Sequence, residues 1–238
     1  MTTVLNWLAN FHGTFWGFHR NTGIQKYLVP PPLEYQGGQV SGIWSQGTYW
    51  YLDTRREEHQ SVDEDEYGWL LKWTDKVDRS MKEETNKWGT LLHGDVKGAN
   101  IVFSADSGGS RRCALYDFQY AGLGLVTRDL VYFIGTTAQS ASIRRIEQEK
   151  EILRAYHSEL LRTIASRQNH DQTTGNSTVG SRSDSEGYTF PTLWRHWEIA
   201  IVDWYRFMAG WGFWGNDSWV ERRAKEIVLG WDEHTLTI

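Results

Sequence analysis

Apolar residues recur every three or four positions in residues 1–17, which is the spacing of an amphipathic helix. Thr2 or Thr3 is suited to cap this helix. The segment has no basic start and no small-residue cleavage site, so the sequence does not predict a signal peptide. The apolar positions are Val4, Leu5, Leu8, Phe11, Phe15 and Trp16.

The same periodicity predicts further helices along the chain. They cover residues 65–88, 128–137, 143–166, 191–211 and 218–229, the last one closed by Gly230. Residues 167–189 are polar and nearly free of aliphatic side chains, so they cannot bury enough apolar area to offset the entropy of ordering. We therefore predict a disordered insert at 167–189.

Three short apolar runs predict strands at Leu91–His93, Asn100–Ser104 and Cys113–Tyr116. A loop joins the first two, and the turn Asp106–Gly109 joins the last two. This strand–loop–strand–turn–strand unit is a small β-hairpin assembly among helices. The sequence thus predicts a single, mostly α-helical α+β domain over residues 1–238.

Composition excludes several classes of protein. The 238 residues carry a formal net charge of −5 with a sequence pI near 5.9, which gives no basic surface for nucleic acid. No apolar stretch reaches the roughly 20 residues of a membrane span. The single Cys113 excludes an internal disulfide, and we interpret it as a buried, inert thiol. A cytoplasmic protein is the expectation.

The loop between the first two strands carries the chemistry. His93-Gly94-Asp95 is followed by Asn100, and the third strand leads into Asp117. Two acids and one amide at the ends of short strands are what a site needs to hold Mg²⁺ and orient a hydroxyl beside a nucleotide phosphate. The order matches the kinase pattern H-x-D-x-x-x-x-N followed by D-F.

Each residue of the pattern then has an expected role. Asp95 would accept the proton of the acceptor hydroxyl, and Lys97 would place an ammonium near the transferring phosphate. Asn100 and Asp117 would supply the oxygen ligands of Mg²⁺. The residues expected to shape the site are His93, Gly94 and Phe118.

The segments HGDVKGAN and YDFQYAG resemble the aminoglycoside phosphotransferase and choline kinase-like group, which shares the protein-kinase-like fold. RDLVYFIG resembles that group's helix with a structural aspartate, which would be Asp129. Gly94 and Gln119 stand where protein kinases have other residues, so the resemblance is to small-molecule kinases. It implies the C-terminal lobe of the fold, with ATP as co-substrate.

The resemblance also implies an N-terminal lobe that the sequence does not reveal. Gly37, Gly38 and Gly42 follow three prolines and do not read as a phosphate-covering loop between strands. Lys26 and Lys72 lack the strand context of a phosphate-binding lysine. We expect the N-terminal lobe to be missing, through an incomplete gene model, a shortened paralogue or a lobe supplied by another chain.

A tryptophan stripe near the C-terminus has two interpretations. Asp203 and Trp204 could line a site for a cationic substrate, because ammonium groups favour aromatic faces. Alternatively, the stripe packs the core and Asp203 pairs with Arg206, and we favour this packing. The stripe consists of Trp194, Trp197, Trp204, Trp211 and Trp214.

Together these patterns predict a Mg²⁺- and ATP-dependent kinase that phosphorylates a small-molecule hydroxyl. The alternative is a kinase-like module that binds a ligand without turnover, since the glycine-rich loop is not found. A protein kinase is disfavoured because no Ala-Pro-Glu segment follows Asp117.

Overall fold

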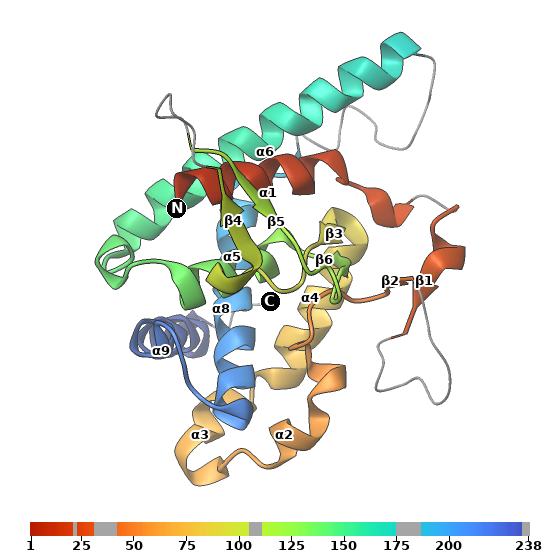
Figure 1. The fold of residues 1–238 in the computed structure, drawn as a ribbon. Coiled ribbons are helices and arrows are strands. Elements are labelled where there is room, and N and C mark those ends of the chain that lie inside the picture. The colour runs from red at the N-terminus through yellow and green to blue at the C-terminus, as the bar shows by residue number, and fades with distance from the viewer. Residues whose placement is uncertain (21–22, 31–41, 105–110, 175–186, 235–238) are drawn as a thin grey trace.

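Helices form most of the computed structural model, which describes residues 1–20, 23–30, 42–104, 111–174 and 187–234 (Figure 1). The α-helices are α1 Thr2–Thr14, α2 Arg56–Gln60, α3 Glu64–Leu71, α4 Thr74–Trp88, α5 Val126–Thr137, α6 Ile146–Thr174, α8 Phe190–Trp211 and α9 Asp217–His234. The strands are β1 Leu28–Val29, β2 Ile43–Trp44, β3 Thr90–Leu92, β4 Ile101–Phe103, β5 Cys113–Leu115 and β6 Gly122–Gly124. The predicted mostly helical α+β class agrees with this architecture.

Helices α5 and α8 run through the interior. Helix α5 is buried from Val126 to Gly135, and this buried stretch includes the charged residues Arg128 and Asp129 as well as apolar side chains. Helix α8 begins after Thr189, whose side chain accepts a hydrogen bond from the Thr192 N–H, and Pro191 suits the first turn. It contacts α4, α5, α6 and α9, so it is the central packing element of the domain.

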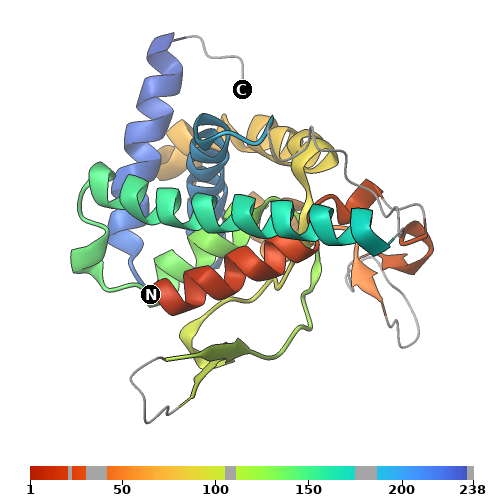
Figure 2. The same ribbon diagram turned by 90° about the horizontal axis from the view of Figure 1, so that it is seen from above.

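Helices α1 and α6 lie side by side in both views (Figures 1 and 2). They meet closely at Gly13, where a Cβ would lie 2.8 Å from the Thr163 side chain. At the end of this contact the Arg167 guanidinium donates to the carbonyls of Thr14 and Trp16, at 2.6 and 3.1 Å. Arg167, which we predicted to lie in a disordered insert, therefore stabilises the contact between α1 and α6.

The predicted insert at 167–189 is wrong at both of its described ends. Helix α6 continues to Thr174, because Arg167 anchors its last turns to the end of α1. At the other end Tyr188 is fully buried, with its ring against Trp16 and Trp88. Residues 175–186 lie outside the described residues.

The strands form two separate sheets. The four-stranded sheet has the order β1-β2-β6-β3, with β1, β2 and β6 parallel and β3 antiparallel to β6. Strands β4 and β5 form an antiparallel hairpin that pairs Ile101 with Leu115. This hairpin projects from the helical body (Figure 2). The three predicted strands therefore exist, but β3 belongs to a different sheet from the other two. The predicted turn at 106–109 lies outside the described residues.

Several other helix boundaries differ from the prediction. The helix predicted over 65–88 is broken between α3 and α4, where the Trp73 ring packs against Trp231 of α9. Helix α9 continues past Gly230 to His234, because the buried Trp231 fastens its end. Helix α1 is preceded by Met1 without a side-chain cap, so the predicted threonine cap is wrong. Tertiary packing outweighs local preference at the first two places.

No described helix is both long enough and apolar enough to cross a membrane. Cys113 is half-buried, so the prediction that its thiol is buried is wrong; what burial there is raises the pKa of the thiol.

Candidate active site

The loop that follows β3 is fastened to helix α5 at two points. The Asp129 carboxylate accepts hydrogen bonds from the backbone N–H groups of His93 and Gly94, at 2.8 and 2.9 Å. Two turns further along α5, the Thr137 hydroxyl accepts from the N–H of Gly98 at 3.0 Å. A buried helix therefore serves as a rigid support for residues 93–98.

Asp129 is itself held by α1. The His12 Nε2 lies 3.1 Å from the Asp129 carboxylate, and His12 Nδ1 lies 2.7 Å from the Tyr156 hydroxyl. Burial opposes the charge of Asp129, but hydrogen bonds from His12 and from the backbone of Gly94 hold its pKa below the ordinary value. Asp129 is thus an ionised, fully engaged acceptor in the interior.

Gly94 is required by the course of the loop. Its φ of +86° lies in the region that side chains rarely adopt, and a Cβ would lie 2.2 Å from the carbonyl oxygen of Tyr120. The loop therefore passes directly against the segment that follows Asp117. This close approach brings the two halves of the sequence motif together.

Asp95 is fully buried, and its two oxygens have different surroundings. Oδ2 accepts from Lys97 Nζ at 2.8 Å and from Asn100 Nδ2 at 2.9 Å. Oδ1 is buried and makes no hydrogen bond of normal geometry with any described residue, although the Tyr132 hydroxyl is near enough to interact with the Asp95 carboxylate. A buried carboxylate oxygen without a donor is costly, so it indicates a place where a ligand hydroxyl would bind.

His93 connects this loop to the end of β5. Its Nδ1 accepts from the Asp95 N–H at 3.2 Å, so Nε2 carries the proton and donates to the Tyr116 carbonyl at 3.0 Å. The Phe118 ring lies over the imidazole, with centroids 4.4 Å apart. His93 and Phe118 therefore position the backbone on either side of Asp117.

Asp117 adopts a left-handed backbone conformation with φ of 64°. Such conformations are strained for non-glycine residues and are concentrated at functional sites. Its carboxylate is exposed and makes no hydrogen bond with any described residue. The Asn100 carbonyl accepts from the Tyr116 N–H at 3.2 Å, which joins the two ligand-bearing segments.

The oxygens of Asn100 and Asp117 fit a Mg²⁺ ion by their chemistry. The Asn100 amide is bound through Nδ2, to the backbone and carboxylate oxygens of Asp95, and these bonds leave Oδ1 for a metal. No cluster of three His, Cys, Asp or Glu side chains that could hold a metal occurs among the described residues. Mg²⁺ usually takes only one or two carboxylates together with substrate phosphates and water, so such a cluster is not needed.

The family model of the ecdysteroid kinase-like family matches residues 38–168, which is more than half of the chain. The chain belongs to the ecdysteroid kinase-like family. This is a protein-kinase-like family whose members are small-molecule kinases. The match bears out the predicted relationship to choline kinase-like enzymes, but not to aminoglycoside phosphotransferases in particular. No curated protein and no solved structure matches the chain.

The stretch matched by the ecdysteroid kinase-like family contains two tyrosines that the sequence analysis did not identify. The hydroxyls of Tyr49 and Tyr132 lie 3.2 Å apart. Burial, with a smaller contribution from Asp95, raises the pKa of Tyr49 to about 12, although the hydrogen bond with Tyr132 opposes this effect. Burial, followed by Tyr49 and Asp95, raises the pKa of Tyr132 well above its ordinary value. Both phenols therefore stay protonated beside Asp95. Tyr132 lies one turn after Asp129, which is the only sequence signal that could have indicated it.

The loop that carries Tyr49 is also strained. Thr48 has φ of 76°, which is a rare conformation for a β-branched residue, and its N–H donates to the Tyr120 carbonyl at 3.1 Å. The Tyr49 ring packs at 5.0 Å from the Tyr120 ring. This strained turn holds Tyr49 against the segment after Asp117.

Asp203 and Trp204 lie outside the family match, and the structure places both in the interior. Asp203 Oδ1 accepts from Arg206 at 2.6 and 3.1 Å, and its Oδ2 lies 3.5 Å from Arg128. The Trp204 ring packs against Trp50 and Tyr132. These contacts agree with the packing interpretation of the stripe, of which Trp211 is an exposed member.

Proposed function

We propose that this protein is a Mg²⁺- and ATP-dependent phosphotransferase that phosphorylates a hydroxyl group of a small molecule. The observation that carries the proposal is the Asp95 carboxylate, with Oδ2 held by two donors and Oδ1 buried without one. This arrangement suits a general base, because one oxygen is fixed and the other lacks a hydrogen bond that an acceptor hydroxyl would supply.

The proposed reaction uses the groups of this chain for positioning and proton transfer. The acceptor oxygen forms a bond to the γ-phosphorus as the bond from that phosphorus to the β–γ bridging oxygen breaks, and ADP leaves with the bond electrons. The hydroxyl proton passes to Asp95 Oδ1. Lys97 keeps Oδ2 in place, and its partly exposed ammonium would bind the anionic phosphate.

Asn100 and Asp117 are the residues that would hold Mg²⁺ in this proposal. The ion would neutralise the charge that develops on the phosphates. His93, Gly94, Phe118 and Asp129 keep the two ligand-bearing segments in register. We place the reaction in the cytoplasm, since a single half-buried cysteine fits a reducing compartment.

On the acceptor side, we propose Tyr49 and Tyr132 in place of Asp203 and Trp204. Their hydroxyls lie beside Asp95, whereas the Asp203 carboxylate already pairs with Arg206 and Trp204 is buried in the core. The family's name makes ecdysteroids the first compounds to include in an acceptor panel.

Nucleotide binding can be tested without knowing the acceptor. We expect Mg-ATP to raise the melting temperature of the wild-type protein in a saturable way, by the equivalent of about 2.7 kcal/mol at 100 times Kd. Asp117→Asn should weaken this effect in the presence of Mg²⁺, whereas Asp65→Asn, which alters an exposed residue of α3, should leave it unchanged. Absence of any shift at millimolar Mg-ATP would contradict the proposal and favour a binding module without turnover.

A further inference from the structure

A polar cavity lies between α4, β6 and the residues that follow β2. Its volume is about 230 Å³, several times that of a water molecule. The exposed residues Ser45 and Asn86 stand at its rim, and the buried Arg128 lies at its base. The polar side chains that line it are Ser45, Gln46, Lys82, Thr85, Asn86 and Arg128.

Arg128 is the unusual member of this lining. The residue is 4% exposed, yet its guanidinium makes no hydrogen bond with any described residue. Its one ion pair, with Asp203 Oδ2, is long at 3.5 Å. The rings of Trp50 and Tyr51 lie 5.4 and 5.9 Å from its central carbon, so they cover the face of the guanidinium. The N–H edge is the part left to bind an acceptor.

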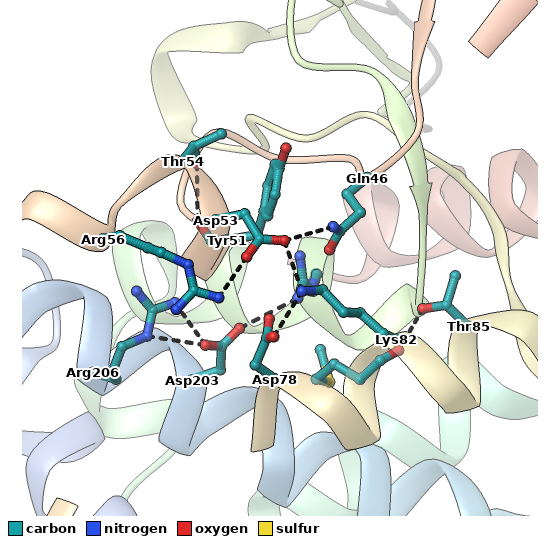
Figure 3. A network of polar contacts seen from close by, with 12 residues as sticks. Gln46, Tyr51, Asp53, Thr54, Arg56, Asp78, Lys82, Thr85, Asp203 and Arg206 are labelled. Atoms are coloured by element: carbon teal, nitrogen blue, oxygen red, sulfur yellow. Dashed lines mark hydrogen bonds and ion pairs between the residues drawn. The ribbon is translucent and has the colours of Figure 1, made fainter. Parts of the chain in front are cut away.

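The neighbouring acidic groups are already engaged by other cations (Figure 3). Asp203 accepts two hydrogen bonds from Arg206. Lys82 Nζ donates to both Asp53 and Asp78 at 2.7 Å, which leaves its third proton for another acceptor.

The buried guanidinium groups beside the cavity are unequally paired. Among the described residues, Asp203 is the carboxylate that forms ion pairs with both Arg206 and Arg128, at 2.6 and 3.5 Å, and both of its hydrogen bonds come from Arg206. Asp53 and Asp78 are engaged by Lys82. A buried charge without hydrogen bonds or full compensation is unfavourable, so it points to an anion that would complete the site.

We propose that this cavity is a binding site for a phosphate-sized oxyanion, with the N–H edge of Arg128 and the free proton of Lys82 as its principal donors. Gln46 and the side chains at the rim would supply further polar contacts. An oxyanion with several oxygens fits donors that converge from α4, α5 and the segment after β2. Burial lowers the pKa of Arg128 and Asp203 opposes this effect, so an anion at its edge would remove an existing cost.

The site is separate from the catalytic loop, and its residues are not those proposed to act in phosphotransfer. It would take the anion whether or not the chain phosphorylates a substrate. An experiment that disproves anion binding at this cavity would therefore leave the proposed phosphotransfer untouched, and the reverse also holds.

The test is a thermal-shift titration with inorganic phosphate, compared with sodium chloride and sodium acetate at equal ionic strength. We expect a saturable rise in melting temperature with phosphate only. Equal responses to phosphate and chloride would overturn the proposal, because Arg128 would then be only an internal counter-ion of Asp203. An equal rise in melting temperature with acetate would overturn the proposal that the cavity selects a phosphate-sized oxyanion.

Two variants locate the effect. Arg128→Gln should abolish the phosphate response, while Lys87→Gln, which removes an exposed cation from the same helix as Lys82, should retain it. If Arg128→Gln does not fold, Ser45→Trp offers a second test, because it blocks the rim of the cavity from an exposed position. This variant should raise the apparent Kd for phosphate at least tenfold. A full phosphate response in Ser45→Trp would overturn the assignment of the cavity.

Discussion

Replacing Asp129 by Asn changes the support of the catalytic loop while keeping the size of the side chain. The carboxylate accepts from two backbone N–H groups of the loop and from His12. Asparagine keeps one acceptor oxygen, and its NH₂ group would face a donor. At least one buried N–H of His93 or Gly94 would then have no acceptor.

The expected cost follows from these bonds. Each hydrogen bond to a charged acceptor contributes about 1.5–3 kcal/mol, so the loss of one or two should reduce the free energy of unfolding by about 2–4 kcal/mol. Because the pKa of Asp129 is lowered in the folded protein, this contribution is present above its unfolded pKa of about 3.9. It should be lost as pH falls through the folded pKa.

Urea unfolding at pH 7 measures the free energy, and amide hydrogen exchange measures the protection of the His93 and Gly94 N–H groups. Asp203→Asn is the matched control, since it removes a second buried carboxylate that does not contact the loop. We expect both variants to lose stability, but only Asp129→Asn to lose protection selectively at 93–94. Unchanged protection there, or a loss below about 0.5 kcal/mol, would refute the proposed support.

Three further predictions use other parts of the fold. Gly94→Ala should cost more than about 2 kcal/mol in urea unfolding because of its φ and its contact with backbone, whereas Gly68→Ala on α3 should be neutral or stabilising. A hydrogen bond from His196 lowers the pKa of Glu84 to about 2. Glu84→Gln should therefore reduce the free energy of unfolding by about 1–2 kcal/mol at pH 7, after allowance for solvent screening. The difference in free energy between this variant and the wild type should shrink as pH falls from about 4.5 towards 2. Glu149 is the buried acceptor of two tryptophan N–H groups and an arginine, so Glu149→Ala should lower the free energy of unfolding by about 3 kcal/mol or more, and a loss within about 0.5 kcal/mol would contradict this reading.

Local pattern predicted the parts of the site that are close in sequence. His93, Asp95 and Asn100 lie on one loop, and the strand before Asp117 was visible as an apolar run. The structure brings these residues together through hydrogen bonds between neighbouring segments, as between the Tyr116 N–H and the Asn100 carbonyl. Resemblance to a kinase family added Asp129.

Long-range contacts could not be predicted in this way. His12 lies 117 residues from Asp129, and Tyr49 lies 83 residues from Tyr132, so periodicity carries no information about either pair. The same reason explains why the end of α6 was missed, since the anchor of Arg167 is on α1. Where a side chain near the end of a helix contacts another element, local propensity alone predicted the wrong end for that helix.

The most direct test of the central claim is transfer of labelled γ-phosphate from Mg-ATP to a panel of small-molecule alcohols that includes ecdysteroids. The wild-type protein and the exposed-site control Asp65→Asn should transfer phosphate at equal rates. Asp95→Asn should be slower by about 100-fold or more, because general-base catalysis contributes that much. Transfer by Asp95→Asn within about threefold of the wild-type rate would contradict the role of Asp95 in catalysis.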